Sequence, residues 1–507
     1  MSTGGKLRAG ALSFGSSVVI GVASAGPAYS ITATLGLIVA AVGLQTPIIV
    51  LIAFVPMLLV AIGYRELNAA DPDAGTTFVW ATRAFGPFLG WMSGWAIVVA
   101  DLLVMASLAQ VSAQYTFLLF GADGIGGDPS NPWVLSLGVA YIVAMTWIAV
   151  RGIDISARLQ RLLLSIEVLM LVAFAAIALV RVALGDAGDQ AITPDWSWFN
   201  PFAIDSFSTF VNATLLMVFI YWGWDSVVSV NEETVDPRHT PGRSAVVSTI
   251  ALVALYIVVT MAAQAFAGVG TEGIGLANPE HVDDVLGALG AAVFGSGPVG
   301  EVLVNLLIVM VLTSAAASTQ TTILPTSRTT FSMAVHGALP AVFGRVHPRW
   351  RTPTVSTIVF GALSVALYVL LDVTSGGLLV IDAVSAIGIS VGFYYALTGL
   401  ACVWLYRREL RTNARVALVR GVLPGLGGAM LIFATVWTGV TSWAADFGET
   451  ALTLPFTDVT IDSVFLLGVG GLLLGIPLYL LTKERMPAYF RGERLDRELP
   501  VLDESRA

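Results

Sequence analysis

Charged side chains are scarce in this chain of 507 residues. Only 12% of the residues are Asp, Glu, Lys or Arg, whereas 56% are apolar. Soluble domains carry roughly 25% charged residues, so this composition excludes a soluble globular protein and indicates one that crosses a lipid bilayer many times. The single cysteine, Cys402, excludes an internal disulfide. Since Cys402 lies in an apolar run, we interpret it as a packing residue.

Sequence signals for catalysis and for nucleotide binding are also missing. The chain has no phosphate-binding loop and no pairing of a nucleophile with a base that would suggest covalent catalysis. Its four histidines all fall in predicted loops, which disfavours a metal cluster or a histidine proton relay. We therefore expect neither an enzyme nor a primary pump, and no metal or cofactor. The net charge of −9 comes from acidic loops and does not indicate a nucleic-acid partner.

Long apolar segments fill most of the chain and predict its fold class. A segment of about 20 apolar residues can cross the roughly 30 Å of hydrocarbon in a bilayer. Twelve such segments lie at residues 11–43, 47–64, 88–120, 133–150, 159–184, 207–231, 244–269, 299–326, 354–371, 377–405, 421–441 and 462–482. The expected fold is an all-α integral membrane protein with 12 transmembrane helices and no soluble domain. Residues 284–294 are expected to form either a short interfacial helix or a plain loop.

Basic residues are distributed unevenly between the predicted loops. When alternate loops are assigned to one side, starting with the N-terminus, that side collects 24 of the 25 Lys and Arg residues and leaves only Arg181 on the other. Cytoplasmic loops of membrane proteins carry an excess of Lys and Arg. We therefore expect a multi-pass protein of the plasma (inner) membrane with both termini in the cytoplasm, including residues 1–10 and the charged tail 483–507.

Two of the apolar segments carry helix-breaking residues near their middle. The first contains 24-SAGPAYS-30, and the sixth contains 221-YWGWDS-226. Interrupted helices at corresponding positions of two halves indicate a transporter built from an inverted repeat, with its binding site near the bilayer midplane. The predicted architecture is a 5+5 inverted repeat of residues 11–184 and 207–405 with broken helices 1 and 6, and residues 421–482 lie outside it.

The two predicted breaks expose backbone groups of opposite polarity. In the first segment, Pro27 suits the first turn of a new half-helix, whose free amides attract an anion such as a carboxylate. In the sixth segment, the half-helix that ends near Phe219 to Trp222 leaves carbonyl groups that suit an ammonium group. An anion seat beside a cation seat matches a zwitterionic amino acid. A pair of kinks without any ligand is the alternative.

Three further stretches resemble the amino acid/polyamine/organocation (APC) transporter superfamily. They are 67-LNAADPDAGTTFVWATRAFGPFLGWMSGW-95, 231-NEETVDPRHTPGR-243 and 327-SRTTFSMAVHGALP-340, all on the predicted cytoplasmic side. The resemblance covers most of residues 11–440. It implies a LeuT-like fold, alternating access, and uptake of amino acids or amines that is often driven by protons.

The resemblance also implies which residues hold the substrate. Ser24, Ala25 and Gly26 would meet its carboxylate. The carbonyl groups of Phe219, Ile220 and Trp222 would meet its amine, and Trp224 matches an aromatic gate. Because Trp222 replaces a smaller residue of the family, a reshaped side-chain pocket is expected. The alternative for both tryptophans is a position facing lipid.

Acidic residues within the apolar segments are the other candidates for function. The resemblance places Glu167 where many proton-coupled members carry a lysine, so the charge is reversed. Asp101 and Asp225 also lie deep in their segments, without a deep Lys or Arg. Charges in a membrane are costly and commonly mark proton or substrate sites. We interpret these three acids as coupling groups or counter-charges, although Asp225 could instead cap a helix.

Hydroxyl groups in 313-TSAAASTQTT-322 offer a second kind of cation site. With Glu167, Ser314 and Ser318 could bind sodium, since hard cations take oxygen ligands. The alternative is that these hydroxyls bond to their own helix, as buried Ser and Thr commonly do. We therefore expect protons rather than sodium as the co-transported ion. Glu232 and Glu233 are interpreted as structural partners of arginines in nearby loops.

These observations lead to one main functional prediction and two alternatives. The main prediction is a secondary active transporter, an amino acid permease working by alternating access and coupled to protons. The first alternative is an importer of a polyamine or another organic amine without a carboxylate, in which Asp101 or Glu167 contacts the substrate. The second is a nutrient sensor that does not transport. The expected partners are a small-molecule substrate and the lipid bilayer.

Overall fold

Helices dominate the computed structural model, which describes residues 7–282, 284–444, 447–453 and 459–500. The helices are α1 (Phe14–Ala25), α2 (Pro27–Val42), α3 (Thr46–Ala70), α4 (Thr77–Phe85), α5 (Pro87–Leu119), α6 (Asp123–Gly126), α7 (Pro132–Arg151), α8 (Ile153–Leu184), α9 (Phe207–Tyr221), α10 (Ser226–Ser229), α11 (Thr240–Ala267), α12 (Val285–Phe294), α13 (Pro298–Val335), α14 (Thr354–Ser375), α15 (Leu378–Tyr406), α16 (Ala414–Val416), α17 (Leu423–Thr441), α18 (Ser463–Phe465), α19 (Gly471–Leu473), α20 (Gly475–Arg485) and α21 (Pro487–Phe490). One short antiparallel hairpin joins β1 (Ala451–Thr453) to β2 (Thr460–Asp462).

Ten stretches of the described chain are helical, long and apolar enough to cross a membrane. The predicted segments 11–43 and 47–64 lie together in one of these stretches, Phe14–Ala70. The predicted segment 207–231 contains the shorter apolar helix α9 and the four-residue helix α10. A multi-pass helical membrane protein is thus established, and the number of twelve crossings stays a prediction. Residues 285–294 form the helix α12, so of the two predictions for residues 284–294 the short helix is confirmed and the plain loop is wrong.

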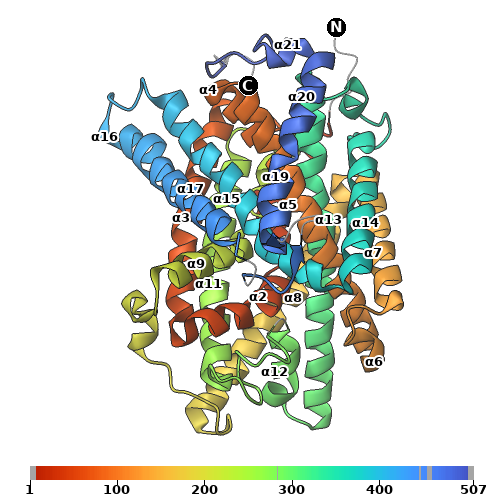
Figure 1. The fold of residues 1–507 in the computed structure, drawn as a ribbon, viewed down its shortest axis with the longest axis vertical. Coiled ribbons are helices and arrows are strands. Elements are labelled where there is room, and N and C mark those ends of the chain that lie inside the picture. The colour runs from red at the N-terminus through yellow and green to blue at the C-terminus, as the bar shows by residue number, and fades with distance from the viewer. Residues whose placement is uncertain (1–6, 283, 445–446, 454–458, 501–507) are drawn as a thin grey trace.

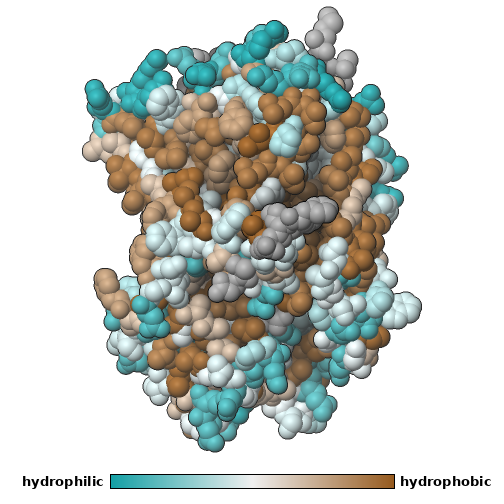
Figure 2. Space-filling model, viewed as in Figure 1, coloured by the Kyte–Doolittle hydropathy of each residue, from teal (hydrophilic) through white to brown (hydrophobic). Residues whose placement is uncertain are grey.

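The long helices run roughly along the longest axis of the molecule (Figure 1). The helices α4, α16 and α21 lie together at one end, and we call this the terminal end. The helix α12 lies at the opposite end. Figure 2 shows apolar side chains over much of the visible side of the bundle and hydrophilic ones gathered at the top and bottom, as expected for a protein that spans a bilayer.

Two helices are interrupted inside the bundle, at the positions that the sequence indicates. Between α1 and α2, Gly26 adopts a left-handed conformation with φ 53°, and Pro27 opens α2. Proline lacks an N–H and suits the first turn of a helix, so the interruption leaves no extra unpaired donor there. Between α9 and α10, Trp222 is extended and Gly223 has φ 112°. Both interruptions are therefore built on glycines in conformations that other residues rarely adopt.

Candidate functional site

The two helix interruptions meet in the middle of the bundle. A Cβ atom placed on Gly223 would lie 2.6 Å from the carbonyl carbon of Ser24 and 2.8 Å from the amide nitrogen of Ala25. A Cβ atom on Gly26 would lie 2.4 Å from Ser318 Oγ on α13. Gly223 thus allows the backbones of the two interruptions to approach closely, and Gly26 leaves room for the Ser318 side chain of α13.

Substituting Gly223 by alanine is expected to separate the two interruptions. The new methyl group would strain a residue with φ 112° and would collide with backbone atoms that cannot move independently. We expect a lower melting temperature and loss of substrate uptake in reconstituted vesicles. Gly297→Ala is a matched control, because Gly297 has open space around its Cα and an extended backbone. If Gly223→Ala behaves like that control, the close approach has no role.

A small cavity of about 10 Å³ lies between the interruptions, and we call it the central cavity. It is lined by Ser24, Ala25, Tyr29, Ser30, Val104, Leu108, Phe219, Trp222, Ser318 and Thr322. Four of the seven predicted substrate residues are among them. Its volume is close to that of one water molecule, so the structure shows the cavity in a contracted form.

The backbone groups predicted to hold substrate are bonded within the protein in this form. The Gly26 amide donates to the Ala23 carbonyl at 3.1 Å. The carbonyl of Phe219 accepts from the Trp222 amide at 2.9 Å, and that of Ile220 accepts from the Tyr256 hydroxyl at 2.5 Å. Substrate would have to displace these bonds, so the predicted backbone contacts stay predictions.

The predicted gate residue Trp224 is fully buried away from the residues that line the central cavity. Its ring contacts the rings of Tyr64 and Tyr395, with centroids 5.1 and 5.0 Å apart. Trp222 is also buried and lines the central cavity. Neither tryptophan faces lipid, which excludes the alternative interpretation of both.

Glu167 of α8 occupies the N-terminal end of α2. Its Oε1 atom accepts a hydrogen bond from the Ala28 amide at 2.7 Å and another from the Ser314 hydroxyl at 2.6 Å. The Tyr29 amide in turn donates to Ser314 Oγ at 3.1 Å. Within the described chain, Glu167 Oε2 is buried and has no hydrogen-bond partner. A carboxylate and a hydroxyl therefore satisfy the first two free amides of α2, where the helix dipole favours negative charge.

The hydroxyl groups of the stretch 313–322 in α13 differ in their hydrogen-bond partners. Ser314 bonds to Glu167, and Ser318 donates to the Ala23 carbonyl at 2.9 Å. Thr319 and Thr321 instead bond back to carbonyl groups of their own helix. Ser314 and Ser318 thus face the interruption in α1–α2. In the part of the chain that the structure describes, no cluster of three or more His, Cys, Asp or Glu could hold a metal ion.

Asp225 is held by two tyrosines that the sequence analysis did not identify. Tyr395 and Tyr394 of α15 donate to its two carboxylate oxygens at 2.8 and 3.0 Å. The indole of Trp222 donates to the Tyr394 hydroxyl at 2.5 Å, so a chain of hydrogen bonds joins the central cavity to Asp225. Among the described residues, Asp225 makes no side-chain capping bond to α10, which rules out the capping interpretation. Adjacent tyrosines in the apolar run 391-VGFYYAL-397 were the available signal, since buried hydroxyls require partners.

Asp101 lies on α5 and bonds to α13. Its Oδ2 atom accepts a hydrogen bond from the Thr326 hydroxyl, while Oδ1 is buried without a partner among the described residues. Another acid in a membrane-length helix, Asp382 of α15, accepts hydrogen bonds from the Glu449 and Thr450 amides and from the Ser463 hydroxyl. Asp382 is therefore a structural residue that fastens the connection before α18 to α15. Asp101 and Glu167 each keep one buried carboxylate oxygen without a partner among the described residues, as does Asp372 in the last turn of α14.

The terminal end is closed by polar contacts between α13 and two loops. Arg328 forms a fully buried ion pair with Glu233, at 3.0 Å, which confirms the predicted structural role of that acid. Asp73 accepts from Ser332 at 2.6 Å, and its Oδ2 lies 2.8 Å from His336 Nε2. Burial disfavours the charged imidazole, but the hydrogen bond and charge of Asp73 outweigh it and raise the pKa of His336. The pair of His336 and Asp73 therefore contributes to the stability of the folded protein. This contribution is complete below the ordinary pKa of histidine and is lost as the pH rises through the raised pKa of His336.

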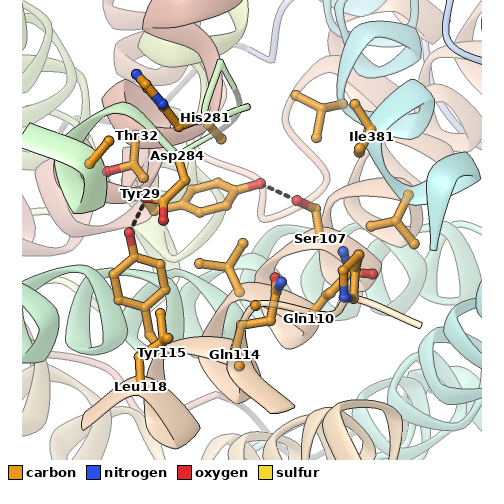
Figure 3. A pocket seen from close by; sticks show the side chains of 18 of the residues that line it. Tyr29, Thr32, Ser107, Gln110, Gln114, Tyr115, Leu118, His281, Asp284 and Ile381 are labelled. Atoms are coloured by element: carbon orange, nitrogen blue, oxygen red, sulfur yellow. Dashed lines mark hydrogen bonds between the residues drawn. The ribbon is translucent and has the colours of Figure 1, made fainter. Parts of the chain in front are cut away.

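A larger cavity of about 410 Å³ lies between the central cavity and the opposite end, and we call it the vestibule (Figure 3). It is lined by residues of α2, α5, α6, α12 and α15 and of the loops beside them. Tyr29 lines both cavities, and its hydroxyl donates to Ser107 at 2.8 Å. The structure is therefore closed at the terminal end and hollow toward the opposite end, with Tyr29 between the two cavities.

A helical membrane bundle with two interrupted helices around a central cavity, closed at one end, defines a membrane transporter. The chain belongs to the amino acid permease family, whose model matches residues 6–459, and thus to the APC superfamily. It is 27% identical to an uncharacterized transporter of Mycobacterium tuberculosis over 76% of this chain and 78% of the relative. It is 22% identical to the branched-chain amino acid permease BcaP of Bacillus subtilis, covering 78% and 80% of the two chains.

Solved structures also share this fold. The transporter MhsT, solved in complex with L-phenylalanine, matches with a TM-score of 0.57 at 16% identity, over 82% of this chain and 98% of MhsT. At this identity the likeness concerns the fold alone, which is the LeuT-type fold expected from the sequence. A small-molecule substrate and a lipid environment follow from family membership.

Proposed function

We propose that this protein is a secondary active transporter that moves an amino acid across the plasma membrane by alternating access, together with protons. The observation that carries the proposal is the meeting of two interrupted helices at a contracted cavity, with the Glu167 carboxylate at the start of α2. Interrupted helices at the midplane are the sites where transporters of this architecture bind substrate. The proposal includes twelve crossings and a 5+5 inverted repeat.

The orientation in the membrane follows from the distribution of charge. We assign the terminal end to the cytoplasm, because the loops on that side carry 24 of the 25 basic residues. The vestibule then opens toward the outside. The structure is accordingly assigned to the outward-facing half of the transport cycle, with the central cavity contracted.

Two of the relatives and one solved structure support an amino acid as the substrate, whereas another relative, from Bacillus subtilis, is named as a methylthioribose transporter. BcaP is named as a branched-chain amino acid permease, and a relative from Arabidopsis thaliana, 25% identical over 70% of this chain, as a cationic amino acid transporter. The protein MhsT was solved with L-phenylalanine. These substrates share a carboxylate and an ammonium group on one carbon, which is the pair of charges that the two interruptions are suited to hold.

Protons are the proposed coupling ion. Glu167 and Asp101 are buried carboxylates with an unsatisfied oxygen, and a carboxyl group that gains a proton can be satisfied as a donor as well as an acceptor. Asp225, connected to the central cavity through Tyr394, is the third candidate. Sodium bound by Glu167, Ser314 and Ser318 is the alternative, which ion replacement in the transport assay would test.

The contacts of Glu167 favour one second candidate, an importer of an organic amine without a carboxylate. In this structure the first two free amides of α2 already bond to the Glu167 carboxylate and to Ser314. If they stay bonded when substrate binds, the protein itself supplies the negative charge at this end of the cavity. The substrate then needs only an ammonium group to complement it.

Matched pairs of ligands should separate the two candidates by thermal stabilisation of the purified protein. The pairs are leucine with 3-methylbutylamine, phenylalanine with phenethylamine, and lysine with cadaverine. A ligand at 100 times its dissociation constant adds about 2.7 kcal/mol of stability to the native state. We expect an amino acid to raise the melting temperature by more than its amine does.

Equal or greater stabilisation by the amine would overturn the amino acid assignment and favour the amine importer. Flux measured in reconstituted vesicles completes the test. A ligand that binds but is not transported would indicate a nutrient sensor.

A further inference from the structure

The vestibule contains buried polar atoms that the protein does not satisfy. Gln110 Oε1 and Thr32 Oγ1 both belong to lining residues, which are 5% and 3% exposed, and neither atom has a hydrogen-bond partner among the described residues. Figure 3 shows both side chains at this cavity, on α5 and α2. Buried polar groups without partners are rare in folded proteins, because each one loses its hydrogen bonds to water. Their position beside a cavity of about 410 Å³ indicates that a ligand with hydrogen-bond donors completes them.

The charge of the vestibule is negative. Glu280 and Asp284 line it, and the described lining residues include no Lys or Arg. Arg181, the single basic residue on this side in the sequence prediction, bonds to the Ala292 and Val293 carbonyls at the C-terminal end of α12, whereas Asp284 stands at the N-terminal end. A cavity with charge of one sign and walls of low polarity concentrates ions of the opposite sign.

We propose that the vestibule is a second binding site, for an organic ammonium group, in which Asp284 provides the charge and Gln110 and Thr32 provide oxygen partners. This site rests on the proposed transport function. It identifies the chemical group by which a substrate is held in the vestibule before it passes Tyr29, which lines both cavities. An ammonium group has three donors and no acceptor, so it matches a set of carboxylate, amide and hydroxyl oxygens.

A purely structural role of Asp284 can be separated from this function. Asp284 accepts a hydrogen bond from Tyr115 and another from the Gly287 amide, at 3.2 Å for the amide, and so caps α12. Asparagine is an equally good cap and keeps an oxygen for both donors, but it has no charge. Asp284→Asn should therefore preserve α12 and weaken only the attraction for cations.

The test uses cysteines as reporters of local charge. Cys402 is fully buried, so a Gln114→Cys variant places the reactive thiol in the vestibule. Its rates of reaction with a cationic and an anionic methanethiosulfonate reagent are compared with those of Phe202→Cys, an exposed control position (94%). We expect the cation-to-anion rate ratio at position 114 to exceed the control ratio by about tenfold, and Asp284→Asn to remove most of this excess.

Binding is then tested with n-butylammonium chloride as the probe. It should slow the labelling of Gln114→Cys in the otherwise unchanged protein but not in the Asp284→Asn background. Sodium chloride of equal ionic strength and n-butanol should give no protection. Glu272→Gln, which neutralises an exposed acid outside the lining, is the matched control and should retain protection.

Each outcome of this experiment distinguishes the binding site from the transport function. The proposed site would be overturned if Asp284→Asn left the cation-to-anion rate ratio unchanged. It would also be overturned if the ratio changed but n-butylammonium gave no protection against labelling. Uptake without protection would overturn the site alone. Protection without uptake of any amine or amino acid would contradict the transport function and leave an ammonium-binding cavity.

Discussion

Glu167→Gln is expected to abolish accumulation driven by a pH gradient while leaving substrate binding nearly unchanged. Glutamine keeps an oxygen acceptor for the Ala28 amide and the Ser314 hydroxyl, but it cannot gain or lose a proton. With one proton per substrate, a gradient of one pH unit supports about tenfold accumulation, since each unit is worth about 1.4 kcal/mol. In vesicles that contain the variant, this ratio should fall to equal concentrations inside and outside.

The same chemical change at an exposed position provides the control. Glu301 lies in the first turn of α13 and is exposed, so Glu301→Gln should keep the full pH response. Loss of binding itself in Glu167→Gln would indicate that Glu167 recognises the substrate, as the amine importer requires. If both binding and the pH response persist, Glu167 has neither role, and Asp101 becomes the leading candidate.

Breaking the Glu233–Arg328 pair is expected to produce the largest loss of stability. Both side chains are completely buried, and Arg328→Met would leave the Glu233 carboxylate without its cationic partner in the interior. Removing one partner of a buried pair commonly costs about 3–5 kcal/mol. The melting temperature of the variant in detergent should therefore fall well below that of the unchanged protein.

Two further variants test the cause of that loss. Arg328→Met combined with Glu233→Leu removes both charges and should recover most of the stability, because a well-packed apolar pair can replace a buried ion pair. Arg408→Met breaks an exposed pair with Glu498, whose side chains are 77% and 76% exposed, and should have little effect. If Arg328→Met melts like Arg408→Met, the buried pair does not fasten the terminal end.

The ends of α1 and α9 have a local cause in the sequence. Gly26, Pro27 and Gly223 restrict or free the backbone by their own chemistry, and the chain turns at these residues. The family resemblance rests on local motifs in the same way, and the match over residues 6–459 confirms it. The count of crossings is less well predicted, since the apolar stretch Phe14–Ala70 does not itself show where one crossing ends.

The partners of the buried acids could not be predicted, because they come from distant parts of the chain. Glu167 meets an amide 139 residues away, and Asp225 meets Tyr394 and Tyr395 about 170 residues away. The spacing of these residues along the sequence does not predict such contacts, because the contacts depend on how the helices pack against one another. The vestibule is a further example, since Gln110 and Thr32 appear as ordinary polar residues in apolar helices until α12 is placed beside them.

One long helix has a mechanical consequence for the transport cycle. The 38-residue α13 contacts Glu167 through Ser314, Ala23 through Ser318, Asp101 through Thr326, and Glu233 through Arg328. At 1.5 Å per residue, Ser314 and Arg328 lie roughly 21 Å apart along this one helix, which contains Pro325 between them. One continuous helix thus carries direct contacts to the start of α2, to Asp101 and to the buried ion pair at the terminal end, so these three places cannot be repacked independently of α13.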